Sequence, residues 1–74
     1  MLKLESLLAF VAIVEAGSIT QGARRLQISK SVASERLAKL ERSLGATLMH
    51  RTTRRLMLTE DGIAFHNRAK RILR

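Results

Sequence analysis

Apolar residues recur every three or four positions near the start of the chain, which predicts an amphipathic helix. The stripe consists of Leu4, Leu7, Val11 and Val14, widened by Leu8, Phe10 and Ile13. A helix this apolar is expected to be covered on two sides. Gly17 predicts where it ends, because glycine adopts the left-handed C′ conformation at little cost.

A second helix is predicted from Ile19 to about Leu26. Ser18 and Gln21 have the spacing of a capping box, with serine at the N-cap and glutamine at N3. Gly22, together with the alanine after it, leaves room for another helix to pack close.

A tight turn over 27–29 leads into a third helix of about residues 30–44, with Ser29 as its N-cap and Gly45 at its end. Its core stripe consists of Ala33, Leu37, Leu40 and Leu44. The opposite face carries Ser31, Glu35, Ala38, Lys39 and Arg42, flanked by Lys30 and Ser34. Two helices joined by a short turn, the second amphipathic and basic, predict a helix-turn-helix.

Two short strands are predicted next, over residues 48–51 and 56–58, joined by a basic hairpin tip. Thr59 is the expected N-cap of a fourth helix, whose stripe consists of Phe65, Ala69 and Ile72. No stop signal precedes Arg74, so we expect the sequence to be a fragment of a longer chain. The predicted fold is mainly α, a winged helix-turn-helix with a three-helix core.

The charge is concentrated in the later part of the chain. The 74 residues hold 14 basic and six acidic groups, a net charge of +8. Residues 1–23 hold one base and two acids, whereas residues 24–74 hold thirteen bases and four acids, a net +9. This excess indicates a polyanionic partner, nucleic acid or an anionic membrane surface. The basic segment is therefore expected to be the binding surface.

Several function classes are disfavoured by what the sequence lacks. It has no cysteine for a disulfide or a thiolate metal site, and no apolar run long enough to span a membrane. Only two phenylalanines are present, too few for the stacking platform of an RNA module. His50 and His66 are too far apart in sequence for a local metal pair, and no carboxylate motif accompanies them; no nucleophile–base pair is visible, so neither a metal site nor an enzyme is expected.

The sequence resembles the DNA-binding domain of LysR-type transcriptional regulators over nearly its whole length. The matching residues are Phe10-Val11, Glu15-Ala16-Gly17-Ser18-Ile19-Thr20, Ala23, Leu26, Ser29-Lys30-Ser31-Val32-Ala33-Ser34, Leu40-Glu41, Leu44-Gly45, Leu48, Arg51-Thr52-Thr53-Arg54-Arg55, Leu58-Thr59-Glu60-Asp61-Gly62 and Arg71-Ile72-Leu73. The family usually has Gln-Pro at Lys30-Ser31, arginine or a neutral residue at Glu35, and alanine at Gly22. These departures affect the operator sequence and not the fold.

The resemblance implies a winged helix-turn-helix over residues 1–58 and the first part of a linker and dimerisation helix over 59–74. It implies a homodimer, weak in this fragment, on an interrupted palindrome of double-stranded DNA in the bacterial cytoplasm. A small-molecule effector would bind only a domain absent here, and no cofactor is expected.

Candidate roles follow from combining that resemblance with the helical faces. The residues expected to face base edges are Lys30, Ser31, Ser34 and Glu35. Those expected to face phosphates are Ser18, Thr20, Gln21, Lys39 and Arg51. Those expected in the wing are Thr52, Thr53, Arg54 and Arg55, and those expected to dimerise are Phe65, Ala69 and Ile72.

Alternatives remain open at the level of sequence. The polar face of the third helix also fits a solvated surface, with Arg42 equally suited to either role. Glu35 fits an ion pair with Lys39 at least as well as a contact with cytosine N4. The whole domain could instead bind nucleic acid without sequence preference, or use its basic last helix on a protein or membrane surface.

Overall fold

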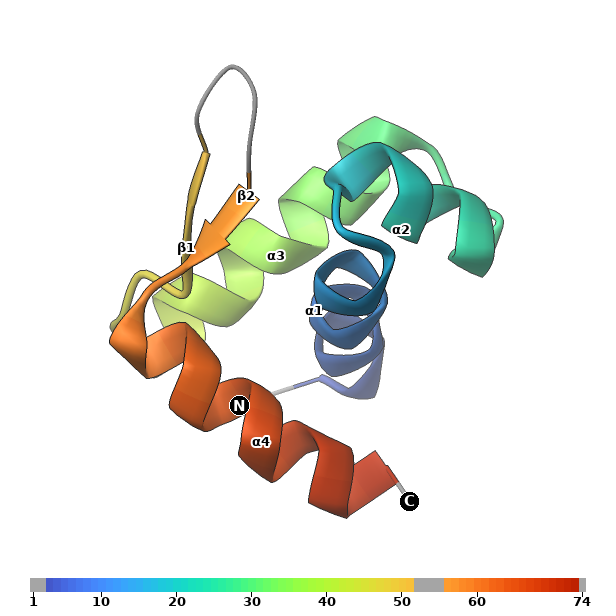
Figure 1. The fold of residues 1–74 in the computed structure, drawn as a ribbon. Coiled ribbons are helices and arrows are strands. Elements are labelled where there is room, and N and C mark those ends of the chain that lie inside the picture. Colours follow the sequence, from blue (N-terminus) through green and yellow to red (C-terminus); the bar gives the residue numbers. More distant parts are fainter. Residues whose placement is uncertain (1–2, 52–55, 74) are drawn as a thin grey trace.

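A computed structural model describes residues 3–51 and 56–73 of the chain. In chain order the elements are α1 (Leu4–Ala16), α2 (Ile19–Leu26), α3 (Lys30–Leu44), β1 (Met49–Arg51), β2 (Leu56–Leu58) and α4 (Glu60–Leu73). This order confirms the predicted mainly helical fold with one hairpin. In Figure 1 the hairpin stands beside α3, and α4 runs along the lower edge of the molecule, on the far side from α2.

The ends of the helices follow from local capping chemistry. Ser18 and Ser29 each accept a hydrogen bond of 3.1 Å, from the backbone N–H of Gln21 and Val32 respectively. Gly17 ends α1 with a φ of 89°, in the left-handed region where glycine has no steric penalty. The predicted N-caps and this glycine stop are therefore confirmed.

The core is built around α1, which contacts α2, α3 and α4. Its largest fully buried side chains are Phe10 and Ile13, and the expected cover on two sides is confirmed. The predicted stripe is wrong at Leu4 and Leu8, which are 63% and 39% exposed. α2 packs closely against α1 at Ile13. A Cβ placed on Gly22 would lie only 2.7 Å from the Ile13 Cα. The close helix packing expected at Gly22 is therefore present.

The hairpin and α4 complete the core from the other side. β1 and β2 are antiparallel, with Met49 opposite Leu58. The strand begins one residue later than predicted, because the Leu48 N–H bonds the Glu41 carboxylate instead of the neighbouring strand. α4 then packs on α1 through an edge-on contact between Phe10 and Phe65, whose ring centroids lie 5.5 Å apart.

Candidate nucleic-acid interface

The two faces of α3 differ as the sequence predicts. Ala33, Leu37 and Leu40 are 0–1% exposed and form the side that packs on the core. The residues on the opposite side, at positions 30, 31, 35, 39 and 42, are all exposed. Ser34 lies on the flank and is half-buried. The small and basic side chains near the start of α3 are therefore presented to solvent, where a ligand can reach them.

The turn between α2 and α3 fixes the direction of that exposed face. Gln27 ends α2 with a φ of 57°. This left-handed conformation is usually adopted by glycine, so the sequence does not predict it at a glutamine. The next N–H, from Ile28, donates to the Ala23 carbonyl at 3.0 Å. Further along, the Arg36 guanidinium lies 3.6 Å from the Glu5 carboxylate, which joins α3 to the start of α1.

Glu35 and Lys39 form an ion pair on the exposed face of α3. The Lys39 Nζ lies 3.5 Å from a Glu35 carboxylate oxygen, one helical turn away, and both side chains are more than half exposed. An exposed pair of this kind contributes about 0.3–0.5 kcal/mol. That is small enough for either side chain to exchange its partner for a phosphate or a base edge.

The start of α2, at the other end of that helix from the turn, presents a second group of polar residues. Ser18 is engaged as the N-cap through its hydroxyl. Thr20 and Gln21 are exposed in the first turn of the helix. The N–H groups of this turn carry the positive end of the helix dipole, which favours an anion such as a phosphate.

The wing is only partly within the described residues. Arg51 is the last residue of β1 and pairs with Leu56 of β2. The remaining wing residues of the sequence prediction, Thr52, Thr53, Arg54 and Arg55, lie outside the described residues. The end of β1 and the start of β2 lie on the side of the hairpin away from α4 (Figure 1).

A junction that sequence analysis missed joins α3 to the hairpin and to α4. In α3, the carboxylate of Glu41 accepts a hydrogen bond of 2.7 Å from the Leu48 N–H. The Leu48 carbonyl in turn accepts one of 3.0 Å from the Thr59 N–H. The Thr59 hydroxyl donates to the Thr47 carbonyl at 2.6 Å and accepts from the Gly62 N–H at 2.9 Å. The predicted cap of α4 by Thr59 is thereby confirmed.

The signal for this junction in the sequence is weak. Glu41 resembles an ordinary surface charge of a helix, and its partner lies seven residues further along the chain. Among the described residues, the two acids of α3 differ in their partners. Glu41 accepts hydrogen bonds from backbone N–H groups outside the helix, whereas Glu35 pairs with Lys39 within it. The glycine at position 62 is the one available hint, because glycine inside a helix usually marks a close approach.

The three residues predicted for dimerisation are divided between the two sides of α4. Ala69 is fully buried within the subunit, and Phe65 rests against Phe10. Ile72 is 69% exposed. In this arrangement α1 covers the inner part of the stripe, and Ile72 is the member accessible to a second subunit.

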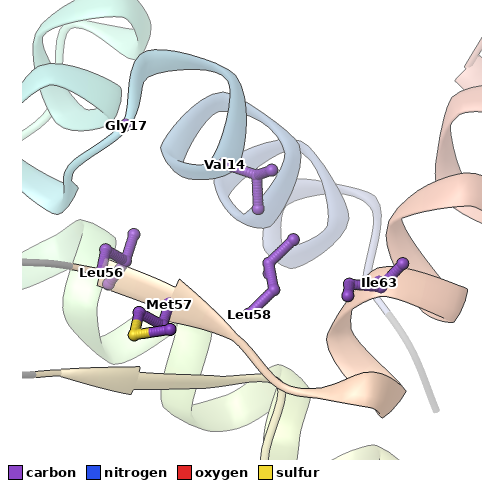
Figure 2. Close-up of a pocket in the computed structure, with 6 residues that line it drawn as sticks. All are labelled: Val14, Gly17, Leu56, Met57, Leu58 and Ile63. Carbon is purple, nitrogen blue, oxygen red and sulfur yellow. The ribbon is translucent and has the colours of Figure 1, made fainter.

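An apolar pocket lies between the end of α1, β2 and the start of α4. Figure 2 shows the residues that line it, which are Val14, Gly17, Leu56, Met57, Leu58 and Ile63. None of these side chains has an ionisable group. Across the described ranges, no three acidic or histidine side chains gather as a metal site would require. No helix there is long and apolar enough to cross a membrane.

Comparison with known proteins places this geometry among bacterial regulators. Residues 4–63 match the family model for bacterial regulatory helix-turn-helix proteins of the lysR family. The chain is 45% identical over 69 residues to the HTH-type transcriptional regulator CrgA of Neisseria meningitidis, which covers 93% of this chain and 23% of CrgA. The chain thus spans about a quarter of the length of curated relatives of this kind.

Solved structures show the same architecture. The crystal structure of a CbnR DBD–DNA complex superposes with a TM-score of 0.92 at 37% identity, covering 96% of this chain and 82% of that one. A BenM DBD in complex with catB site 1 DNA gives a TM-score of 0.92 at 35% identity, covering 96% and 79%. The winged helix-turn-helix prediction is confirmed by these matches.

Proposed function

Because this chain belongs to the lysR family of bacterial regulatory helix-turn-helix proteins, we propose that it binds double-stranded DNA in a sequence-specific manner to regulate transcription. The observation that carries the proposal is the exposed face of α3, which presents small and basic side chains opposite a fully buried apolar face. Small side chains let a helix enter a major groove that is about 12 Å wide. The structural neighbours crystallised with DNA support the same use of the fold.

In this proposal the first turns of α3 contact base edges. The contributing residues are Lys30, Ser31, Ser34 and Glu35, of which three are exposed and Ser34 is half-buried. Hydroxyl, ammonium and carboxylate groups can all pair with donors or acceptors in the major groove. The weak ion pair of Glu35 with Lys39 leaves both free to contact DNA.

Contacts to the DNA backbone fix the register of α3. We assign them to Ser18, Thr20, Gln21, Lys39 and Arg51. The wing, Thr52 to Arg55, would add charge at the backbone or in the minor groove. Phosphate contacts orient a protein on the duplex without carrying sequence information, so these two groups of residues have separable effects on binding.

The division of the chain supports a dimeric regulator. We assign residues 1–58 to DNA binding and 59–74 to the first part of a dimerisation helix, with the exposed Ile72 as a contact between subunits. Two copies would place their α3 helices about 34 Å apart on a palindromic site. We further propose that the protein acts in the bacterial cytoplasm and has no catalytic activity, since its relatives are transcriptional regulators.

Binding measured on a preferred and on a scrambled duplex across a salt series tests the proposal. The preferred duplex is obtained by selection from a random library. If about six phosphates are contacted, log K falls with log salt at a slope near −5. Ser34→Arg is expected to change the ratio of preferred to scrambled binding, whereas Arg54→Ala weakens both and makes the slope about one unit shallower.

Two matched variants control for added or removed charge. Ser43→Arg adds the same charge to an exposed position three turns from the start of α3, and Arg71→Ala removes an exposed arginine from the last turn of α4. Neither is expected to alter sequence preference.

A slope shallower than about −2 would show that the basic surface is mostly solvated. An unchanged preference in Ser34→Arg, with a lost preference in Arg54→Ala, would reverse the roles of α3 and the wing.

A further inference from the structure

Val32 is a large apolar side chain that lies outside the buried stripe of α3. Val32 is 37% exposed in the first turn of that helix, beside the polar residues proposed to face bases. Successive helical residues are rotated by about 100°, so Val32 and Ser34 lie on opposite flanks of the exposed face, each about 100° from the buried Ala33. Val32 and Ser34 therefore border the exposed face of α3 from its two sides.

The Val32 side chain is held in place before any ligand arrives. Its backbone N–H donates to the Ser29 hydroxyl at 3.1 Å, which anchors the first turn. A β-branched side chain has one strongly preferred rotamer in a helix. The two methyl groups therefore face a fixed direction, and little conformational entropy is lost when they contact a ligand.

Packing within the protein covers only part of the Val32 surface. Alanine has the higher helix propensity, and more than a third of the Val32 side chain remains in water. The exposed part is an apolar surface beside the polar residues proposed to face bases, and it is available to an apolar group of a ligand. Its neighbours Lys30 and Ser31 supply charge and hydrogen bonds, so Val32 adds the one exposed apolar side chain of this turn.

The major groove offers a matching apolar group. Among the four bases, only thymine presents a methyl group there, at C5. We propose that Val32 contacts the C5-methyl group of a thymine in the operator and is a specificity-determining residue. This inference rests on the proposed DNA-binding function and names one feature of its target, a thymine facing the first turn of α3.

The test combines removal of the methyl group from DNA with its removal from the protein. A preferred duplex is selected with the 74-residue chain, and each thymine is then replaced singly by deoxyuridine, which lacks only the C5-methyl. At one thymine the wild-type chain is expected to lose roughly fourfold in affinity, the value for one buried methyl group. Val32→Ala is expected to lose less than twofold for the same replacement.

A second arm identifies the methyl group itself. At the responsive position, the thymine–adenine pair is replaced by cytosine–guanine or by 5-methylcytosine–guanine. Wild-type binding is expected to be stronger to the methylated cytosine than to cytosine, and Val32→Ala to bind both alike. Equal wild-type binding to the two cytosine duplexes would show that a feature of thymine other than its methyl group is recognised.

Val14→Ala is the matched control, because it removes the same two methyl groups from a half-buried valine of α1. It is expected to keep the wild-type response to deoxyuridine at every position. If Val32→Ala also responds as wild type does at every thymine, the inference is refuted while DNA binding stands. If the selection yields no preferred sequence, the proposed function itself fails and the role of Val32 fails with it.

Discussion

Replacing Gly62 by alanine would separate α4 from the hairpin. Gly62 lies in the first turn of α4, and its φ angle is not positive, unlike those of Gly17 and Gly45. Its lack of a side chain therefore serves close packing and not backbone freedom. A Cβ there would overlap the Leu48 carbonyl oxygen and would lie 2.9 Å from the Leu48 carbonyl carbon and 3.1 Å from Leu58 Cδ2.

Two opposing effects decide the size of the change. Alanine favours a helix interior over glycine by about 1 kcal/mol. Against this, overpacking costs about 1–3 kcal/mol, and the backbone of Leu48 cannot rotate away as a side chain would. The displacement also strains the hydrogen bonds of Thr59 to Leu48 and Thr47, each worth about 1 kcal/mol. Gly62→Ala is therefore expected to lower the free energy of unfolding by about 2–4 kcal/mol.

Urea and thermal unfolding followed by circular dichroism measure this change. For a domain of this size a loss of about 2 kcal/mol or more corresponds to a fall in Tm of about 10 °C or more. Gly45→Ala is the control, because Gly45 has a φ of 66° and a Cβ added there would meet nothing within 4 Å among the described residues, so its cost of about 1–2 kcal/mol is conformational only. A Gly62→Ala variant as stable as the wild type, or no less stable than Gly45→Ala, would refute the packing argument.

Three further substitutions test other contacts by the same unfolding measurement. Glu41→Ala removes the acceptor of the Leu48 N–H and is expected to cost about 1–3 kcal/mol, with Glu41→Gln retaining part of the bond; equal stability of Glu41→Ala and wild type would contradict this. Ser29→Ala removes the N-cap of α3 and is expected to cost about 1 kcal/mol; an unchanged urea midpoint would count against the cap. His66→Leu removes a buried Nε2 that has no hydrogen-bond partner within the described residues and is expected to stabilise by about 1 kcal/mol; a lower midpoint would show that the nitrogen has a role.

The fold can be predicted wherever its cause is local in the sequence. Ser18 and Ser29 cap helices through backbone groups three residues away, so their role depends on spacing alone. Gly17 ends α1 for the same reason. The prediction for Leu4 is wrong because its burial depends on which helices cover α1, and the apolar stripe does not contain that information.

The candidate site is less predictable because its parts meet through tertiary contacts. The stripe of α4 is correctly identified as apolar, but the sequence does not show that α1 covers Phe65 and Ala69 and leaves Ile72 exposed. Val32 escapes sequence analysis because it lies off the periodic stripe. Its exposure is known only once the packing of α3 fixes which of its flanks faces solvent.

The junction at Leu48 connects these observations to function. Through its N–H, Leu48 holds Glu41 of α3, and through its carbonyl it holds Thr59 at the start of α4. Gly62 permits the close approach that keeps the second bond short. The helix proposed to read DNA and the helix proposed to pair subunits are thereby fixed to one residue. If the proposed dimer matches the spacing of two half-sites, a change in the hydrogen bonds of this junction would alter the angle between α3 and α4 and with it the placement of the two α3 helices.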